Sequence, residues 1–485
     1  MIFQALLTLP GTIRGVLLLP ALWLTALGAT AQSPASISLP AGIPLKRIGY
    51  APLPGVGRHL LLTVGQPGGH PRCTPLLVQV YDSTLHLLGQ HSAQLRGKCT
   101  LIETNPIKGQ YSAAFQFRQH NTWADSTFLL AFDAGGRPTG VLASRQHITG
   151  RNRATPLNLP TADLLVKSAG STRRQFTVQS LRPSLQPCWE QSFVAPRGAA
   201  RLNAYAADST HLWLLLTEHA NSRRNNPVAV CLDLATGRQL SRTPLTTGSG
   251  LREVSTCTIG PNHSLSIVGH AFAGTRPKNS RMGELFLLRL QPDGRVLTDH
   301  QVAVDQLPAR HKVIWRQVAN SPNGGLRVIG ETYTRTSFGG MVAFYAVSWA
   351  ATFTYAAQQE VTLRPRDLLL LDFNSAGQLQ QRQLVALPKG GSFYKGRYLA
   401  ARRLAREAAE RGRFRYRATA PGNVTLLRTK QGLLAVRANG QAAVPLRAQA
   451  DHCVQDIVGT SGHQVLVTEF NKKKKQFSLL QVPFN

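Results

Sequence analysis

Four acidic or imidazole side chains recur at one place in a repeated sequence pattern. Each follows an apolar run and a Thr or Gly, as in LWLLLTEH, LSIVGHAF, LRVIGETY and VLVTEF, and the four residues are Glu218, His270, Glu331 and Glu469. If the runs are equivalent strands of a repeated unit, these side chains form part of a ring at one rim. Such a ring is a candidate binding site for a divalent cation such as Ca²⁺, or for a sugar or basic ligand. Polar residues that simply end each strand at the solvent are the alternative interpretation.

Other sequence signatures of catalysis are missing. The sequence has no G-x-S-x-G in a plausible strand–turn–helix context, no H-E-x-x-H and no P-loop, so no catalytic residue is predicted. It has no Cys/His spacing typical of a zinc site, and the identity of any metal is left open. A pair of carboxylates for glycoside hydrolysis stays possible, because the separation of such a pair is spatial and not sequential.

Five of the six cysteines fall into two groups. Cys73 and Cys99 bracket the first predicted hairpin and are the candidate disulfide of an exported protein. Cys231, Cys257 and Cys453 lie in apolar runs, which is typical of small buried core residues.

The elements that must position these residues are β-hairpins. An apolar run, then Asp or Asn with Gly, then a second run recurs along the chain: LLVQVYDSTLHLLG, FLLAFDAGGRPTGVLA, VAVCLDLATGRQL, LFLLRLQPDGRVL, LLLLDFNSAGQLQ and LLAVRANGQAAV. Asp, Asn and Gly tolerate the positive φ that tight turns require. Together with the upstream runs, each unit has four strands, and helical periodicity is nearly absent.

Repeated four-stranded units of this size predict an all-β fold, a β-propeller of seven or eight blades with one short basic helical insertion. The units fall near residues 46–95, 98–148, 161–194, 200–245, 251–303, 311–387, 413–447 and 452–485. The third is short and irregular, and the last supplies only three strands. We expect the segment SISLPAGIPLKRIGY to add the missing strand and close the ring.

Two motifs resemble known propeller families. Val228–Leu240 is similar to the repeat of quinoprotein-type propellers, and the motifs around Gly269 and Gly330 resemble repeats of secreted bacterial propeller proteins, many of unassigned function. The resemblance implies the fold and no particular activity. The quinoprotein repeats usually carry Trp after the turn, whereas the positions after Gly237 and Gly294 hold none.

The N-terminus predicts export. Arg14 is followed by an apolar run, Val16–Leu27, and then by small residues up to Ala31, which is the pattern of a cleavable signal peptide. We expect residues 1–31 to be removed and residues 32–485 to form one propeller domain in the periplasm, in the cell envelope or outside the cell. An uncleaved membrane anchor is the alternative, although the run is shorter than the ~20 residues of a spanning helix.

The charge balance bears on partners. The chain of 485 residues has 55 Lys and Arg against 23 Asp and Glu, a net charge of +32, while its 43% of hydrophobic residues excludes a disordered polyelectrolyte. Because the protein is expected to be exported, nucleic acid is not the expected partner. An unknown protein or glycan, or an anionic envelope polymer, fits better, and we expect a monomer without a transmembrane span after cleavage.

Insertions interrupt the repeat near residues 336–359 and 396–413. The first is uncharged and aromatic, and the second predicts a helix over Tyr398–Arg411. Its candidate anionic-surface contacts are Arg402, Arg403, Arg406 and Arg411; a solvated linker between blades is the plainer interpretation. Lys472–Lys475 occupy a predicted turn.

Together these features predict an exported, non-catalytic binding or scaffolding propeller at the bacterial envelope or in the extracellular space. The alternative is a propeller enzyme with a rim or axial site, either a carbohydrate-active hydrolase or lyase or a quinoprotein-like oxidoreductase.

Overall fold

The described part of the chain consists almost entirely of β-strands. It was analysed in a computed structural model that describes residues 35–37, 48–53, 58–64, 73–96, 98–107, 110–118, 125–144, 154–158, 163–169, 175–182, 186–195, 200–221, 224–246, 251–272, 284–302, 312–321, 323–335, 360–388, 394–397, 401–410, 412–437, 443–461, 463–474 and 476–484. The predicted signal peptide (1–31) and the insertion at 336–359 lie outside these residues.

The strands form eight antiparallel sheets, which we number as blades along the chain. Blades 1 to 4 are β2(Ile48–Leu53) β3(Arg58–Val64) β4(Cys73–Tyr81) β5(Leu87–Arg96); β6(Lys98–Ile107) β7(Gln110–Arg118) β8(Asp125–Phe132) β9(Pro138–Ser144); β10(Ala154–Asn158) β11(Asp163–Ala169) β12(Gln175–Leu181) β13(Pro187–Val194); and β14(Ala200–Ala207) β15(His211–Asn221) β16(Arg224–Asp233) β17(Gln239–Pro244). Blades 5 to 8 are β18(Leu251–Ile259) β19(Leu265–Phe272) β20(Glu284–Leu290) β21(Val296–Val302); β22(Lys312–Asn320) β23(Leu326–Arg335) β24(Glu360–Phe373) β25(Leu379–Val385), with β26(Tyr394–Arg397) paired to β24; β27(Tyr416–Ala420) β28(Val424–Arg428) β29(Gly432–Val436) β30(Val444–Ala448); and β31(Cys453–Ser461) β32(Gln464–Asn471) β33(Gln476–Pro483) β1(Ala35–Ile37).

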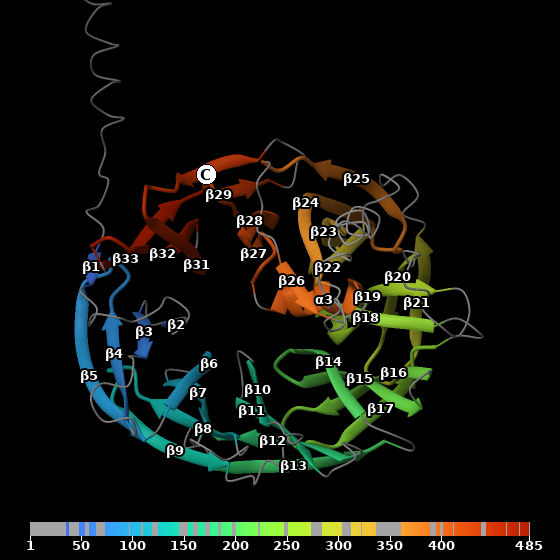
Figure 1. The fold of residues 1–485 in the computed structure, drawn as a ribbon. Helices are drawn as coiled ribbons and strands as arrows, with labels where there is room; N and C mark the ends of the chain where they lie inside the picture. Colours follow the sequence, from blue (N-terminus) through green and yellow to red (C-terminus); the bar gives the residue numbers. More distant parts are fainter. Residues whose placement is uncertain are drawn as a thin grey trace, which may run out of the picture.

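The eight sheets are arranged around a ring, with the first strand of each blade nearest the centre (Figure 1). Inner strands of successive blades touch, as β14 with β18, β18 with β22, and β2 with both β6 and β31. The protein is therefore an eight-bladed β-propeller, and the predicted fold class is confirmed. The third unit, which looks irregular in the sequence, has four strands and begins at Ala154.

The core lies between neighbouring blades. In β15 the side chains of Leu212, Leu214 and Leu216 pack against blade 3, whereas Trp213 and Leu215 pack against blade 5. Successive side chains of a strand point to opposite faces, so a strand buried on both faces reads as a continuous apolar run. This explains why the second strands of blades 4, 5, 6 and 8 are recognised in the sequence.

The predicted hairpin turns join the third and fourth strands of the blades. In blades 2, 4, 5 and 6, the turn glycines have positive φ, for example 73° at Gly237. A Cβ at Gly237 would lie 2.5 Å from Cε3 of Trp189, whose Nε1 donates a hydrogen bond to the Leu234 carbonyl at 2.9 Å. Trp189 belongs to the outer strand of blade 3, so the outer strand of one blade contacts the hairpin of the next. His300 repeats this contact in blade 5, with Nε2 3.1 Å from the Ala376 carbonyl of blade 6.

The ring closes through a strand from the N-terminal end of the described chain. β1 pairs antiparallel with β33, with Ala35 opposite Leu479 and Ile37 opposite Phe477. Blade 8 therefore takes three strands from one end of the domain and one from the other. This agrees with the expectation that the SISLPAGIPLKRIGY segment completes the last blade.

The basic insertion forms a helix that packs on the ring. α3 spans Ala401–Glu410, shorter than the predicted Tyr398–Arg411. Leu404, Ala405 and Ala408 are buried against Tyr333 and Leu363 of blade 6, and the helix lies toward the centre of the ring in Figure 1. The helix links blades 6 and 7 in the chain, as expected, but it is not a fully solvated linker, because one face is buried. No described helix is long and apolar enough to cross a membrane.

Candidate functional site

The four predicted ligand-binding residues lie in the second strands of four blades. Glu218 is in β15, His270 in β19, Glu331 in β23 and Glu469 in β32. The strands are equivalent, but the residues are offset by one position.

The offset is measured from a bulge in the pairing of the first and second strands, which falls beside Leu216, Gly269, Gly330 and Val467. Glu218 and Glu469 follow this point by two residues, whereas His270 and Glu331 follow it by one. A one-residue shift turns a side chain to the other face of its sheet. The expected equivalence of the four positions is therefore wrong, because two of the side chains face the preceding blade and two face the following one.

Each glutamate has its own cationic or backbone partners. Glu218 pairs with Arg242 of the same blade. Glu469 accepts hydrogen bonds from Arg447 Nε at 3.2 Å and from Gln455 Nε2 at 2.7 Å. The two carboxylates thus act in separate contacts in blade 4 and between blades 7 and 8.

Glu331 is the most buried of the set, with 1% of its surface exposed. Its carboxylate accepts hydrogen bonds from the backbone N–H groups of Arg415 at 2.9 Å and Tyr416 at 2.7 Å, at the start of β27. Burial lowers the pKa of the Arg415 guanidinium, and the nearby charge of Glu331 opposes that shift. Glu331 therefore joins blade 6 to blade 7.

His270 is also buried, and its ring lies 6.0 Å from the ring of Trp315 in blade 6. The four predicted residues thus occupy four different environments. As a ligand-binding set they stay a prediction.

The other predicted contacts are partly described. Arg406 of α3 pairs with Glu253 of β18 at 2.5 Å. The side chains of Arg402 and Arg403, and the whole of Arg411, lie outside the described residues. So do the side chains of Cys73 in β4 and Cys99 in β6, and the predicted disulfide stays a prediction. Cys231 and Cys453 are buried free thiols, as expected.

A different group of side chains converges at the junction of blades 4 and 5. Asp208 lies in the turn between β14 and β15, His211 begins β15, and His263 ends η2(Pro261–His263), the turn between β18 and β19. One potential ligand atom of each residue lies within 4.8 Å of the others. The two turns are equivalent in neighbouring blades, and contact between the inner strands brings them together.

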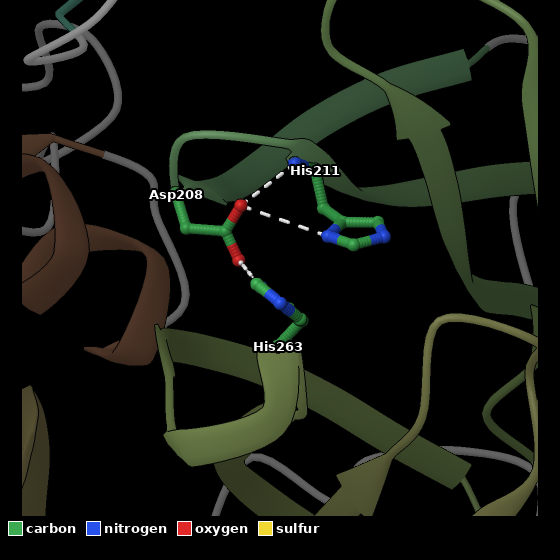
Figure 2. A group of neighbouring side chains, drawn as sticks. All are labelled: Asp208, His211 and His263. Atoms are coloured by element: carbon green, nitrogen blue, oxygen red, sulfur yellow. Dashed lines mark hydrogen bonds and ion pairs between the residues drawn. The ribbon is translucent and has the colours of Figure 1, made fainter.

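The backbone conformation around His263 directs its side chain toward Asp208. Asn262 and His263 have φ values of 57° and 59°, a left-handed conformation that few residues other than glycine adopt. Figure 2 shows the imidazole of His263 reaching Asp208 from below, while His211 approaches the same carboxylate from the side. The two imidazole rings are 4.7 Å apart.

Asp208 is held in place by its own turn. Its Oδ1 accepts hydrogen bonds from the backbone N–H groups of Thr210 and His211, both at 2.7 Å, and its Oδ2 accepts one from His263 Nδ1 at 2.7 Å. Burial alone raises the pKa of this carboxyl, but the hydrogen bonds outweigh burial and lower the pKa to about 2. Asp208 is therefore a carboxylate at neutral pH.

The cluster borders a cavity of about 460 Å³. Its walls come from blades 4 and 5 and include Tyr205, Asp208, Cys257, Thr258 and His263. Burial raises the pKa of the Cys257 thiol to about 12, so this cysteine is a neutral thiol at neutral pH. The site thus offers one carboxylate, two imidazoles and an adjacent space, which are the components of a metal or polar-ligand site.

This site is not predicted from the sequence, because Asp208 and His263 are 55 positions apart and each turn alone looks ordinary. A usable signal was present. When the repeats are aligned, the turns before Leu212 and Leu265 both carry a histidine, and they belong to neighbouring units.

No family model and no curated protein matches the sequence. The solved structures that resemble the chain include quinohemoprotein alcohol dehydrogenase ADHIIG from Pseudomonas putida HK5 (10% identity, 85% of this chain and 68% of that one, TM-score 0.41). They also include a PL25 ulvan lyase (9%, 92% and 96%, TM-score 0.37) and the β-propeller domain of the Trilobed protease from Pyrococcus furiosus (8%, 72% and 98%, TM-score 0.33). At these identities the likeness concerns the fold alone.

Proposed function

We propose that this chain is an exported β-propeller that binds an anionic polymer, at the bacterial envelope or outside the cell, without transforming it. The observation that carries the proposal is the pairing of acidic side chains with arginines of the same chain. Seven acidic side chains of the described residues pair with arginines: Glu218, Glu253, Asp299, Glu331, Asp372, Asp456 and Glu469.

Some of these pairs join strands of one blade, as in Arg252–Asp299 at 2.6 Å, and others join neighbouring blades, as in Arg417–Asp456 at 2.9 Å. These seven carboxylates are therefore engaged in the scaffold, while the chain has 32 more basic than acidic residues. An excess of positive charge attracts polyanions over a distance set by the ionic strength. Lys472, Lys473 and Lys474 add to it on an exposed turn whose backbone is fixed by hydrogen bonds to Asn471 Oδ1.

Binding to dextran sulfate at low and high salt tests the proposal, with uncharged dextran as the control. We expect binding that weakens steeply as NaCl rises from about 0.1 M to about 1 M, because the Debye length falls from about 10 Å to about 3 Å. The polysaccharide should keep its chain length during incubation. Absence of binding at low salt contradicts the proposal, and shortening of the polymer supports the propeller enzyme instead.

The exposed lysine turn gives a sharper version of this test. Replacing Lys472, Lys473 and Lys474 by Gln is expected to weaken binding about tenfold. The matched control replaces three exposed arginines of other hairpin turns, Arg137, Arg238 and Arg295, by Gln. An equal loss in both triple variants indicates that total charge, and not the lysine turn, determines affinity.

Export is tested separately by the mass of the protein recovered from the periplasm or the medium. The expected N-terminus is Gln32, and a protein that keeps residues 1–31 contradicts cleavage.

A further inference from the structure

We propose that Asp208, His211 and His263, assisted by the Thr210 hydroxyl, bind a zinc-type transition-metal dication at the junction of blades 4 and 5. The proposal is independent of polyanion binding. It rests on the atoms that these four residues bring together.

The separations between the donor atoms can be compared with the edge lengths of a coordination tetrahedron. Nδ1 of His263 lies 2.7 Å from Asp208 Oδ2, and Nδ1 of His211 lies 3.6 Å from Asp208 Oδ1. Zn–N and Zn–O bonds of about 2.0–2.2 Å give ligand–ligand edges of about 3.3–3.6 Å in a tetrahedron. The two imidazoles contact different oxygens of the Asp208 carboxylate, and one potential ligand atom of each residue lies within 4.8 Å of the others. Shifts of up to about 1.5 Å therefore bring the donors to these edges.

The hydroxyl of Thr210 completes the set. Its Oγ1 lies 2.7 Å from His211 Nδ1, 3.4 Å from His263 Nδ1 and 3.0 Å from Asp208 Oδ1. It therefore stands beside all three other donors. On metal binding, the neutral imidazoles carry their proton on Nε2, and the Nδ1 lone pairs face the ion. The fourth coordination position is taken by this hydroxyl, by a water or by a small molecule from the cavity.

The choice of metal follows from the donors. Two imidazoles and one carboxylate suit zinc and its neighbours in the first transition row, whereas Ca²⁺ prefers six to eight oxygen ligands. The ionised Asp208 supplies one negative charge. This distinguishes the site from the Ca²⁺ ring suggested by the recurring glutamates.

The chain contains an internal comparison for this site. Asp82, Thr84 and His86 form a turn of the same kind in blade 1, in which Thr84 Oγ1 lies 2.7 Å from Asp82 Oδ1 and 2.8 Å from His86 Nδ1. Among the described residues, no third potential metal ligand lies close enough to Asp82 and His86 to complete a chelating group, although the charge of Asp82 reaches His59. An ordinary Asp–Thr–His turn explains both arrangements up to this point, and the contribution of His263 from the neighbouring blade is what makes the cluster at Asp208 a chelating site.

The test uses the full mature chain without an affinity tag, freed of metal with a chelator, in a Cys188→Ser background that removes the exposed thiol. Zn²⁺ is titrated by calorimetry, and Co²⁺ by the visible absorption of its tetrahedral complexes. We expect one equivalent to bind and the thermal unfolding midpoint to rise with added Zn²⁺.

Two variants decide the outcome. His263→Gln is expected to weaken metal binding about 100-fold or more, since loss of an outer-sphere partner alone costs 10–100-fold. The matched control, His86→Gln, is expected to bind as the parent does. Circular dichroism without metal checks that both variants fold, and a misfolded His263→Gln protein is replaced by His211→Gln.

The proposal is overturned by no binding of either metal, by binding that survives both His263→Gln and His211→Gln, or by an equal loss in His86→Gln. Weak binding of several equivalents in every protein shows adventitious surface binding only, and it also overturns the proposal.

Discussion

Glu331 shows how one buried carboxylate connects two neighbouring blades. Its carboxylate receives two backbone N–H groups from the next blade, and Arg316 lies 3.8 Å away. Replacing Glu331 by Gln removes the charge and one acceptor, so we expect the free energy of unfolding to fall by about 2–4 kcal/mol.

Glu218→Gln is the matched control for this change, because Glu218 pairs with a partly exposed Arg242. Its expected cost is below about 1 kcal/mol. Urea unfolding of the two variants measures the difference. Changed metal or glycan affinity in both variants without loss of stability contradicts the structural role and supports the predicted ligand ring.

Tyr416 supplies a prediction about alkaline pH. Burial raises the pKa of its phenol to about 12, although the hydrogen bond with Thr419 Oγ1 lowers it in part. Because the folded pKa lies above the unfolded value of about 10, the neutral phenol favours the folded state below pH 10. This contribution disappears as the pH rises through about 12.

The comparison is with Tyr416→Phe, which cannot ionise. At neutral pH we expect the wild type to be more stable by up to about 1 kcal/mol, the value of one hydrogen bond. That advantage should shrink or reverse between pH 10 and 12, measured as urea midpoints across the range. Parallel curves for the two proteins refute the explanation.

The hairpin that joins the third and fourth strands of a blade contacts the outer strand of the preceding blade, as at Trp189 and Gly237. Gly237 combines a φ of 73° with the close approach of Trp189. We expect Gly237→Ala to reduce stability by about 2–4 kcal/mol, from the left-handed backbone and from overlap with the indole. Denaturant unfolding measures this cost.

Gly422 in η3(Pro421–Asn423) provides the control, since its φ is 74° and a Cβ there meets nothing within 4 Å. Gly422→Ala should therefore cost only about 1 kcal/mol. Equal losses at the two sites exclude a contribution from the packing of Trp189.

Local chemistry explains which elements the sequence predicts well. Turn glycines, and strands buried on both faces such as Leu212–Leu216, can be recognised from a few neighbouring residues. The hairpins and several second strands are therefore predicted from the sequence. The bulge beside Leu216 cannot be recognised in this way, and the predicted glutamate ring is consequently wrong in register. The meeting of Asp208 with His263 depends on contact between two blades, which no local pattern contains.

At the scale of the whole molecule, the pairing of β1 with β33 closes the ring. Removing residues 32–37 leaves the outer edge of β33 unpaired, so we expect a loss of about 1–3 kcal/mol and more aggregation than in a chain starting at Gln32. Thermal unfolding and light scattering measure the two effects. Unchanged values show that three paired residues do not contribute to closure.

The pairing of Ala35 with Leu479 also sets the order in which the molecule is completed. The two residues are 444 positions apart, and β33 is the last of the described strands in the order of the chain. At a synthesis rate of about 5–20 residues per second, β1 waits about 20–90 s for its partner. Seven blades can form in that interval, but the eighth cannot. A chain that stops before Gln476 therefore leaves β1 without its partner strand and the ring open, whatever the stability of the other blades.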